Sequence, residues 1–321
     1  MPRLRSLLLS AAGLLLALTA FAAAQDYPTK PVRIVVPFPP GALNDMVGRV
    51  IAHELSERLG RQFIVDNRAG AGGVIGAEIV ANAPKDGHTL LIVSLATAVN
   101  PWLYTLPFEP VKAFAPISLI VTSPNVVAVY PGLPVHSIKE LIALAKKEPG
   151  GLQYGSSGVG TFVHLSGELF KLAAGIDMLH IPFKGTAPAM IDLMAGNTKV
   201  TFGSTTSTMP HLRSGKVRAL ALGGARRSPA LPDLPTVTEA GLSYEASNWI
   251  GLVAPAGTPA AVVERLHREI ADIQNSPKVQ QQLAAEGADI ARMSIAEFGA
   301  FQASELAKWG KVVKEAGIKA Q

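Results

Sequence analysis

Short runs of β-branched and aliphatic residues alternate with longer amphipathic stretches along most of the chain. In the first third, this pattern predicts strands at residues 33–36, 63–65 and 89–93 and helices at residues 44–59 and 74–83. In the longer of these two helices, apolar side chains recur on one face and charged side chains occupy the other. Strands that alternate with helices predict doubly wound α/β sheets.

The same alternation returns after residue 127 and ends in a helical tail. The expected strands are residues 152–155, 178–183, 200–203 and 217–222, and the expected helices are residues 138–147, 161–172 and 188–195. After the apolar segment at residues 249–253, further helices are expected at residues 259–274, 277–285 and 295–316. Helices without a sheet of their own must cover an existing one, so we expect this tail to return to the first sheet.

The predicted organisation is therefore two domains, of which the first is discontinuous. We place domain 1 at residues 25–125 plus 248–321 and domain 2 at residues 126–247. The chain then crosses between the domains near residues 123–127 and again near residues 246–249. Two crossing segments form a hinge.

The first 24 residues have the pattern of a secretory signal peptide. Arg3 and Arg5 precede an apolar run over residues 7–21, and small residues follow as far as Ala24. We expect export and cleavage after Ala24, because the run is too short for a comfortable membrane span. The remaining 297 residues contain 27 Lys and Arg against 24 Asp and Glu, so their net charge is +3 instead of +5. A chain of this length exceeds what one hydrophobic core usually serves, which favours two domains.

Composition excludes several classes of function. The chain has no cysteine, which rules out disulfides, thiol nucleophiles and cysteine-ligated metals. The basic excess is spread out and is not interleaved with aromatic residues, so we expect no nucleic-acid partner. The seven histidines lack metal-ligand spacing, and the glycine-rich residues 70–76 miss the dinucleotide-binding spacing by one position. We therefore expect no metal and no cofactor.

Four loops share one design, in which a strand ends, Gly, Ser, Thr or Pro residues follow, and a helix begins. They are residues 38–44, 155–161, 184–188 and 203–207. Such loops leave backbone N–H groups free at helix N-termini, where the helix dipole favours an anion. For any one of these loops alone, ordinary helix capping is the better explanation. Because the loops are divided between the two predicted domains, an anion site between the domains is also indicated.

A hydrolase is the enzymatic alternative. Ser156 or Ser157 with His164 or His180 could suggest a nucleophile and a base. A nucleophile elbow needs glycine two residues after the serine, however, and Val159 stands at that position for Ser157. The residues therefore favour a binding protein over an enzyme.

An ordered set of motifs strongly resembles the Bug-type receptors of tripartite tricarboxylate transporters. The resemblance covers residues 27–317. The motifs lie at residues 27–33, 36–41, 66–73, 86–91, 154–158, 180–185, 231–236 and 254–259. Each motif alone is weak, but their order along the chain is specific.

This resemblance implies a type II periplasmic-binding-protein fold, with two doubly wound α/β lobes joined by a two-segment hinge. It further implies a periplasmic receptor, without enzymatic activity, that captures a small mono- or dicarboxylate, aromatic acids included. Such a receptor delivers its ligand to membrane permease subunits of the transporter, and we expect it to be a monomer. A periplasmic α/β hydrolase or esterase acting on carboxylate esters, and a non-transport sensory receptor, remain the alternatives.

In receptors of this kind, backbone amides and waters of the first two loops typically hold a ligand carboxylate. The ligand-binding residues that the resemblance implies here are Phe38, Pro40, Gly41, Ala42 and Asp45 in the first loop, Ser156, Gly160, Thr161 and His164 in the second, Lys184 and Gly185 in the third, and Ser204 and Thr205 in the fourth. To these we add Ser94, Thr97 and Asn100, which follow the strand at residues 89–93.

The first loop departs from the family pattern at one point. The family usually has a second glycine where this chain has Ala42, and the bulky Leu43 follows it. If the position requires a positive φ angle, alanine is strained there. Leu43 could also narrow the pocket, so this loop is where we expect a difference in ligand pose.

Overall fold

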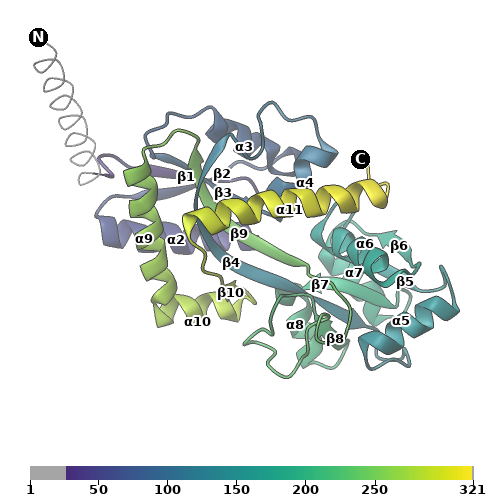
Figure 1. Cartoon of the computed structure of the whole chain (residues 1–321). Coiled ribbons are helices and arrows are strands. Elements are labelled where there is room, and N and C mark those ends of the chain that lie inside the picture. The colour runs from purple at the N-terminus through teal and green to yellow at the C-terminus, as the bar shows by residue number, and fades with distance from the viewer. Residues whose placement is uncertain (1–26, 320–321) are drawn as a thin grey trace, which may run out of the picture.

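The computed structural model describes residues 27–319. The signal peptide predicted at residues 1–24, with its cleavage after Ala24, lies outside these described residues. Figure 1 shows two α/β lobes side by side, connected by the strands β4 and β9, with the C-terminal helix α11 lying across both. Among the described residues, none of the helices combines the length and apolar character that a membrane crossing requires.

The first lobe is built on a sheet with the strand order β2-β1-β3-β9-β4. β1 is parallel to β2 and β3, whereas β9 is antiparallel to β3 and β4. The strands are β1 (Val32–Val36), β2 (Phe63–Asn67), β3 (Thr89–Ser94), β9 (Ser247–Pro255) and the first part of β4 (Phe114–Val129). The helical segments are α2 (Leu43–Leu59), η1 (Ala71–Gly73), α3 (Val74–Ala81), α4 (Leu95–Leu103), α9 (Ala260–Asn275), α10 (Pro277–Ala285) and α11 (Ile295–Glu315). The short β10 (Asp289–Ile290) pairs with β4.

The second lobe continues from the far end of β4. There β4 pairs antiparallel with β7 and β8, and β5 lies parallel to β6 and β7. The strands are β5 (Gln153–Ser156), β6 (Leu179–Pro182), β7 (Val200–Ser204) and β8 (Arg218–Leu222). The helices are α5 (Ile138–Lys147), α6 (Phe162–Ala174), α7 (Thr186–Met194) and α8 (Thr205–Arg213).

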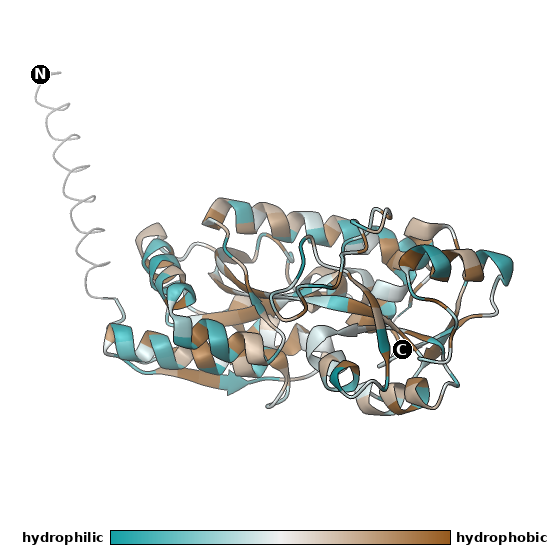
Figure 2. Cartoon of the chain, turned by 90° about the horizontal axis from the view of Figure 1, so that it is seen from below, coloured by the Kyte–Doolittle hydropathy of each residue, from teal (hydrophilic) through white to brown (hydrophobic). Residues whose placement is uncertain are grey.

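Strand β1 shows why both faces of the first sheet are covered. Its side chains alternate between two clusters: Ile34 packs in one that includes α2, and Val35 packs in the other, which includes α3. Both side chains are fully buried. Figure 2 shows the same arrangement, with largely brown strands inside and helices that mix teal and brown residues. A strand buried on both faces has a continuous run of apolar residues, as β1 does over residues 34–36.

The hinge consists of β4 and β9, which lie next to each other where the lobes meet. β4 pairs with β9 as far as Pro124, and from Asn125 onward it pairs with β7. The amide of Asn125 donates to the carbonyl of Ala246 at 3.2 Å. The change of partner coincides with the crossings expected near residues 123–127 and 246–249. The domain boundaries at residues 125/126 and 247/248 stay a prediction.

The C-terminal helices cover the first sheet and extend beyond it. α9 packs beside α2, and Arg58 forms ion pairs of 2.7 Å with both Glu269 and Asp272. α11 packs on α4 and β4 and also contacts α6 of the second lobe (Figure 1). The tail thus returns to the first sheet, and its last helix touches both lobes.

Candidate functional site

A cavity of about 330 Å³ lies between the lobes. It is formed by the segments that follow β1, β2 and β5, together with the end of β3, α4 and one residue of β9. The lining residues are Phe38, Asn44, Gly72, Ser94, Leu95, Ala96, Val99, Asn100, Leu103, Tyr104, Val159, Gly160, Thr161, Phe162 and Asn248. None of these residues is charged, so a ligand here is recognised by dipoles and apolar contact.

Five of the predicted site residues line this cavity. They are Phe38, Ser94, Asn100, Gly160 and Thr161. They come from both lobes: Phe38 from the loop after β1, Ser94 and Asn100 from the end of β3 and from α4, and the other two from the loop after β5. The structure therefore brings together the first loop, the second loop and the segment after β3. The other predicted residues lie outside this lining, and several of them hold its loops in place.

Two helices begin at the cavity without a side-chain cap. The N-cap residues Ala42 of α2 and Thr161 of α6 have extended backbone conformations, and neither side chain accepts a hydrogen bond from the first turn. In contrast, α4 begins with a capping box in which the amide of Ser94 donates to Thr97 Oγ1 at 3.3 Å. Uncapped first-turn amides favour an anion. The geometry thus offers one N-terminus from each lobe to a carboxylate.

Asn44 brings a buried amide donor without a partner to the lining of this cavity. It lies in the first turn of α2 and is only 7% exposed. Its Nδ2 atom is buried and has no hydrogen-bond partner. Buried amide donors are normally paired, because a missing partner leaves the cost of desolvation uncompensated. An acceptor oxygen on a ligand in the cavity would complete this bond.

Asp45 organises the first loop from beneath the cavity. Its Oδ2 accepts hydrogen bonds of 3.0 Å from the Gly41 amide and from Arg49 Nε, and its Oδ1 accepts one of 2.9 Å from Asn67 Nδ2. Burial raises the pKa of this carboxyl, but the bonds from Arg49, Gly41 and Asn67 outweigh burial and hold the pKa below its ordinary value. The cavity lining does not include the predicted residues Pro40, Gly41, Ala42 and Asp45. Asp45 instead holds the loop that precedes α2.

A histidine pair organises the second loop. The amide of Gly160 donates to His164 Nδ1 at 3.0 Å, and the ring of His164 stacks on that of His180 with centroids 3.9 Å apart. His180 Nε2 lies 2.6 Å from Ser156 Oγ. Burial and, to a smaller extent, the charge of Lys171 lower the pKa of His164 to about 4, and burial is also the main reason why the pKa of His180 is lowered to about 4. Both rings are neutral at physiological pH, and His164 must carry its proton on Nε2.

The Ser156–His180 contact does not form a hydrolytic centre. Ser156 is fully buried and lies outside the cavity lining, so a substrate in the cavity does not reach its oxygen. Its Oγ also donates to the carbonyl of Gly158 at 3.2 Å. The pair therefore supports the loop that carries Gly160 and Thr161. In a hydrolase, the base and the nucleophile must both reach the substrate, which this pair does not.

The third and fourth loops lie apart from the cavity. Lys184 and Gly185 precede α7 and are absent from the lining. Ser204 caps α8 by accepting a hydrogen bond of 3.3 Å from the Ser207 amide, and Thr205 donates to the carbonyl of Pro124 at 2.8 Å. The structure thus engages Ser204 and Thr205 within the chain and leaves the cavity to the first two loops and α4.

Sequence reasoning missed most of the apolar wall. Leu95, Val99, Leu103 and Tyr104 come from α4 and its end, and Phe162 opens α6. The apolar positions 95, 99 and 103 are four residues apart, which is helical spacing and could have revealed them. Gly72 lies in the glycine-rich segment at residues 70–76 and Asn248 in the predicted crossing near residues 246–249, but neither was predicted as a ligand contact.

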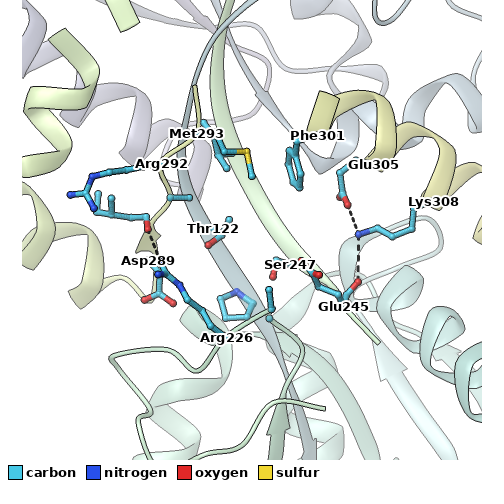
Figure 3. Close-up of a pocket in the computed structure, with 16 residues that line it drawn as sticks. Thr122, Arg226, Glu245, Ser247, Asp289, Arg292, Met293, Phe301, Glu305 and Lys308 are labelled. Carbon is cyan, nitrogen blue, oxygen red and sulfur yellow. Dashed lines mark hydrogen bonds and ion pairs between the residues drawn. The ribbon is translucent and has the colours of Figure 1, made fainter. Parts of the chain in front are cut away.

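A second cavity, of about 350 Å³, lies on the opposite face of the hinge (Figure 3). Ser247 lines this cavity, whereas the next residue, Asn248, lines the first one, as expected for successive residues of a strand. Cationic side chains that line the second cavity already have partners. Arg226 donates to the Ile290 carbonyl at 3.2 Å, and Lys308 pairs with Glu305. The four predicted loops do not reach it. The cavity between the lobes is therefore the candidate ligand site.

Metal ligation is not indicated by the side chains of residues 27–319. No group of three or more His, Asp or Glu side chains in this part of the chain is placed to hold a metal ion.

Comparison with known proteins places the chain among solute receptors. Residues 47–318 match the TctC model, described as the tripartite tricarboxylate transporter family receptor. The protein BugT of Bordetella pertussis is 36% identical over 319 residues, which cover 97% of this chain and 98% of BugT.

Two solved structures from Rhodopseudomonas palustris are similar throughout. One, determined with adipate, is 38% identical with a TM-score of 0.77 and covers 92% of this chain and 100% of its own. The other, MatC with bound malate, is 30% identical with a TM-score of 0.71, and the match covers 89% of this chain and 100% of the MatC chain. These similarities confirm the predicted type II periplasmic-binding fold.

Proposed function

This chain belongs to the tripartite tricarboxylate transporter receptor family, and on that premise we propose that it captures a small carboxylate between its lobes and delivers it to a membrane permease. The family consists of solute-binding receptors, so the prediction of a receptor and not an enzyme is confirmed. The family is also periplasmic. Export through residues 1–24, with cleavage after Ala24, and a monomeric state are further parts of the proposal.

The observation that carries the proposal is the pair of uncapped helix N-termini. α2 comes from the first lobe and α6 from the second, and residues of both line one cavity. A carboxylate between them would accept hydrogen bonds from both lobes at once. Such a ligand stabilises the closed arrangement because it gains contacts from the second lobe only when the lobes approach.

Relatives with bound acids support this assignment. The similar R. palustris structures hold adipate and malate. Both ligands are small carboxylates, and the cavity of this chain, at about 330 Å³, is within the range of small-molecule sites.

Delivery to a permease follows from the role of the family. Nothing in the described residues couples to an energy source, so transport would draw on the permease. Uptake of a labelled ligand by cells that carry or lack this receptor tests delivery. Ligand binding without any effect on uptake would instead favour the sensory receptor.

Thermal unfolding of the chain that begins at Gln25 tests the binding step. A ligand at 100 times its dissociation constant adds about 2.7 kcal/mol to the free energy of unfolding, which raises the melting temperature measurably. We expect at least one small carboxylate to do so while its neutral amide does not, and the acid to be recovered unchanged. Consumption of an ester, or stabilisation by amides alone, would contradict the proposal.

A further inference from the structure

We infer that the ligand is a monocarboxylate with an apolar body and that Asn44 is a specificity-determining residue for it. This inference rests on the proposed function and defines its substrate class. In the inferred complex, Asn44 Nδ2 donates a hydrogen bond to one carboxylate oxygen. The uncapped starts of α2 and α6 receive the same carboxylate, and the apolar wall encloses the rest of the molecule.

Asn44 carries a buried amide donor that no group of the described chain satisfies. Its side chain lines the cavity, is more than nine-tenths buried, and has an unpartnered Nδ2. The neighbouring Asp45 is in the opposite situation, since both of its oxygens are engaged by the loop. A donor that is buried at a cavity wall without a partner indicates a missing acceptor.

The absence of charge from the lining limits the ligand to one carboxylate. None of the lining residues is Lys, Arg or His, so no side-chain cation faces a second carboxylate. The third helix start at the cavity, that of α4, is closed by the Ser94–Thr97 capping box. Asn100 Nδ2 is also engaged, because it donates to the Gly72 carbonyl at 3.0 Å. A second carboxylate would enter an uncharged wall and lose its hydration.

The remaining wall is suited to an apolar body. Leu95, Val99 and Leu103 present one face of α4, and Phe38 and Phe162 stand at the two uncapped helices. Aromatic and aliphatic side chains of this kind bind flat rings and branched chains through burial of apolar surface. A benzoate-like or branched aliphatic acid satisfies the donors at one end and this wall at the other.

The experiment is isothermal titration of the chain that begins at Gln25 with six probes. Benzoate and isovalerate are the monocarboxylates, adipate and malate are the dicarboxylates, and benzamide and isovaleramide are the neutral counterparts. We expect at least one monocarboxylate to bind about tenfold or more tighter than both dicarboxylates, a difference of about 1.4 kcal/mol. Preferred binding of adipate or malate overturns this inference and leaves the proposed function standing. Binding of the amides alone contradicts the proposed function as well.

Variants of Asn44 test its role directly. Asn44→Asp keeps the shape of the side chain but replaces a donor with a negative charge. We expect it to lower the affinity for the monocarboxylate by about a hundredfold. In Asn44→Ser the side chain is smaller but still supplies a donor, its hydroxyl. The affinity should therefore fall less, by about tenfold. Asn82→Asp, at an exposed asparagine after α3, is the matched control and should bind as the unmodified chain does. Circular dichroism shows that each variant is folded, and unchanged affinity in a folded Asn44→Asp overturns the inference.

Discussion

The Nε2 atom of His180 lies 2.6 Å from the hydroxyl oxygen of Ser156, beneath the loop that carries Gly160. His180 stacks in turn on His164, which accepts a hydrogen bond from the Gly160 amide. A stack of two neutral histidines, the buried His164 and the half-buried His180, thus fixes a loop of the ligand cavity. Protonation of either ring would place a positive charge next to the other, and protonation of His164 on Nδ1 would also remove the acceptor of the Gly160 amide.

Acid should therefore destabilise the fold through this pair. The ordinary pKa of histidine is 6.5, and burial lowers the pKa of both rings to about 4 in the folded chain. Between these values the unfolded chain binds more protons, so the free energy of unfolding falls as the pH drops from 6.5 toward 4. Urea denaturation over this range should show the decline. The double variant His164→Gln/His180→Gln should flatten it, and His53→Gln, at an exposed site on α2, should not.

Asp45→Asn should weaken both the first loop and ligand binding. The carboxylate accepts three hydrogen bonds, and an amide in its place turns one acceptor into a donor that faces the Gly41 amide or Arg49. We expect the free energy of unfolding to fall by about 1–3 kcal/mol and the affinity for the ligand to fall about tenfold, equivalent to about 1.4 kcal/mol.

Asp272→Asn is the control for this charge. Asp272 pairs with Arg58 at 2.7 Å, but its side chain is 62% exposed. An exposed pair of this kind contributes about 0–1 kcal/mol. Equal losses from the two variants would contradict an organising role for Asp45.

Gly160→Ala should impair binding for a steric reason. Gly160 has a φ angle of +76°, and an added Cβ would lie 3.0 Å from Leu103 Cδ1, inside the cavity. Gly175→Ala is a close match, with a φ angle of +60° and open space around the added atom. Both variants should lose about 1–2 kcal/mol of stability, because alanine is strained in the left-handed region. Only Gly160→Ala should lower ligand affinity in titration, and a similar loss in Gly175→Ala would point to a general effect.

Much of the fold was predictable because local capping agrees with the tertiary structure. The helices at residues 138–147 and 277–285 were predicted with their observed bounds. Ser137 caps the first by accepting a hydrogen bond from the Glu140 amide, and Pro277 begins the second. Where a boundary depends on such local contacts, the sequence is sufficient.

Other elements could not be predicted, because their local features conflict with the structure. α4 begins directly after β3 with no loop between them, and Pro101 lies inside it, where proline usually ends a helix. β4 extends over 16 residues although it contains Pro116 and Pro124, which usually argue against a strand. Pairing with β9 and with the second lobe overrides these local preferences.

The site was predictable at the level of loops but not of single groups. The first two loops do meet at one cavity, as the carboxyl ends of parallel strands should. Yet the structure engages the Gly41 amide with Asp45 and the Gly160 amide with His164. Asn44, which was not among the predicted contacts, has its Nδ2 left without a partner. Which donors remain for a ligand depends on side-chain directions that only the folded chain defines.

Glu305 connects the C-terminal helix α11 to strand β9 of the hinge. Its Oε2 accepts hydrogen bonds of 2.9 Å from the indole nitrogens of Trp249 on β9 and Trp309 on α11, and its other oxygen pairs with Lys308. The residue is only 4% exposed. Glu305→Leu would leave two buried indole donors unpaired and would remove the partner of Lys308. We expect the free energy of unfolding to fall by about 3–5 kcal/mol.

Two further variants separate the hydrogen bonds from the charge. Glu305→Gln keeps an acceptor oxygen for the indoles and should lose less, about 1–3 kcal/mol. Glu315→Gln, on the same helix, removes a carboxylate that lies 3.9 Å from Lys311 and is 45% exposed, and it should change stability by less than about 0.5 kcal/mol. Urea denaturation of the three variants measures these differences. If Glu305→Leu were no less stable than Glu315→Gln, the two indole bonds would not contribute to holding α11 on β9, and apolar packing of Trp249 against Phe298 and Phe301 would account for that contact.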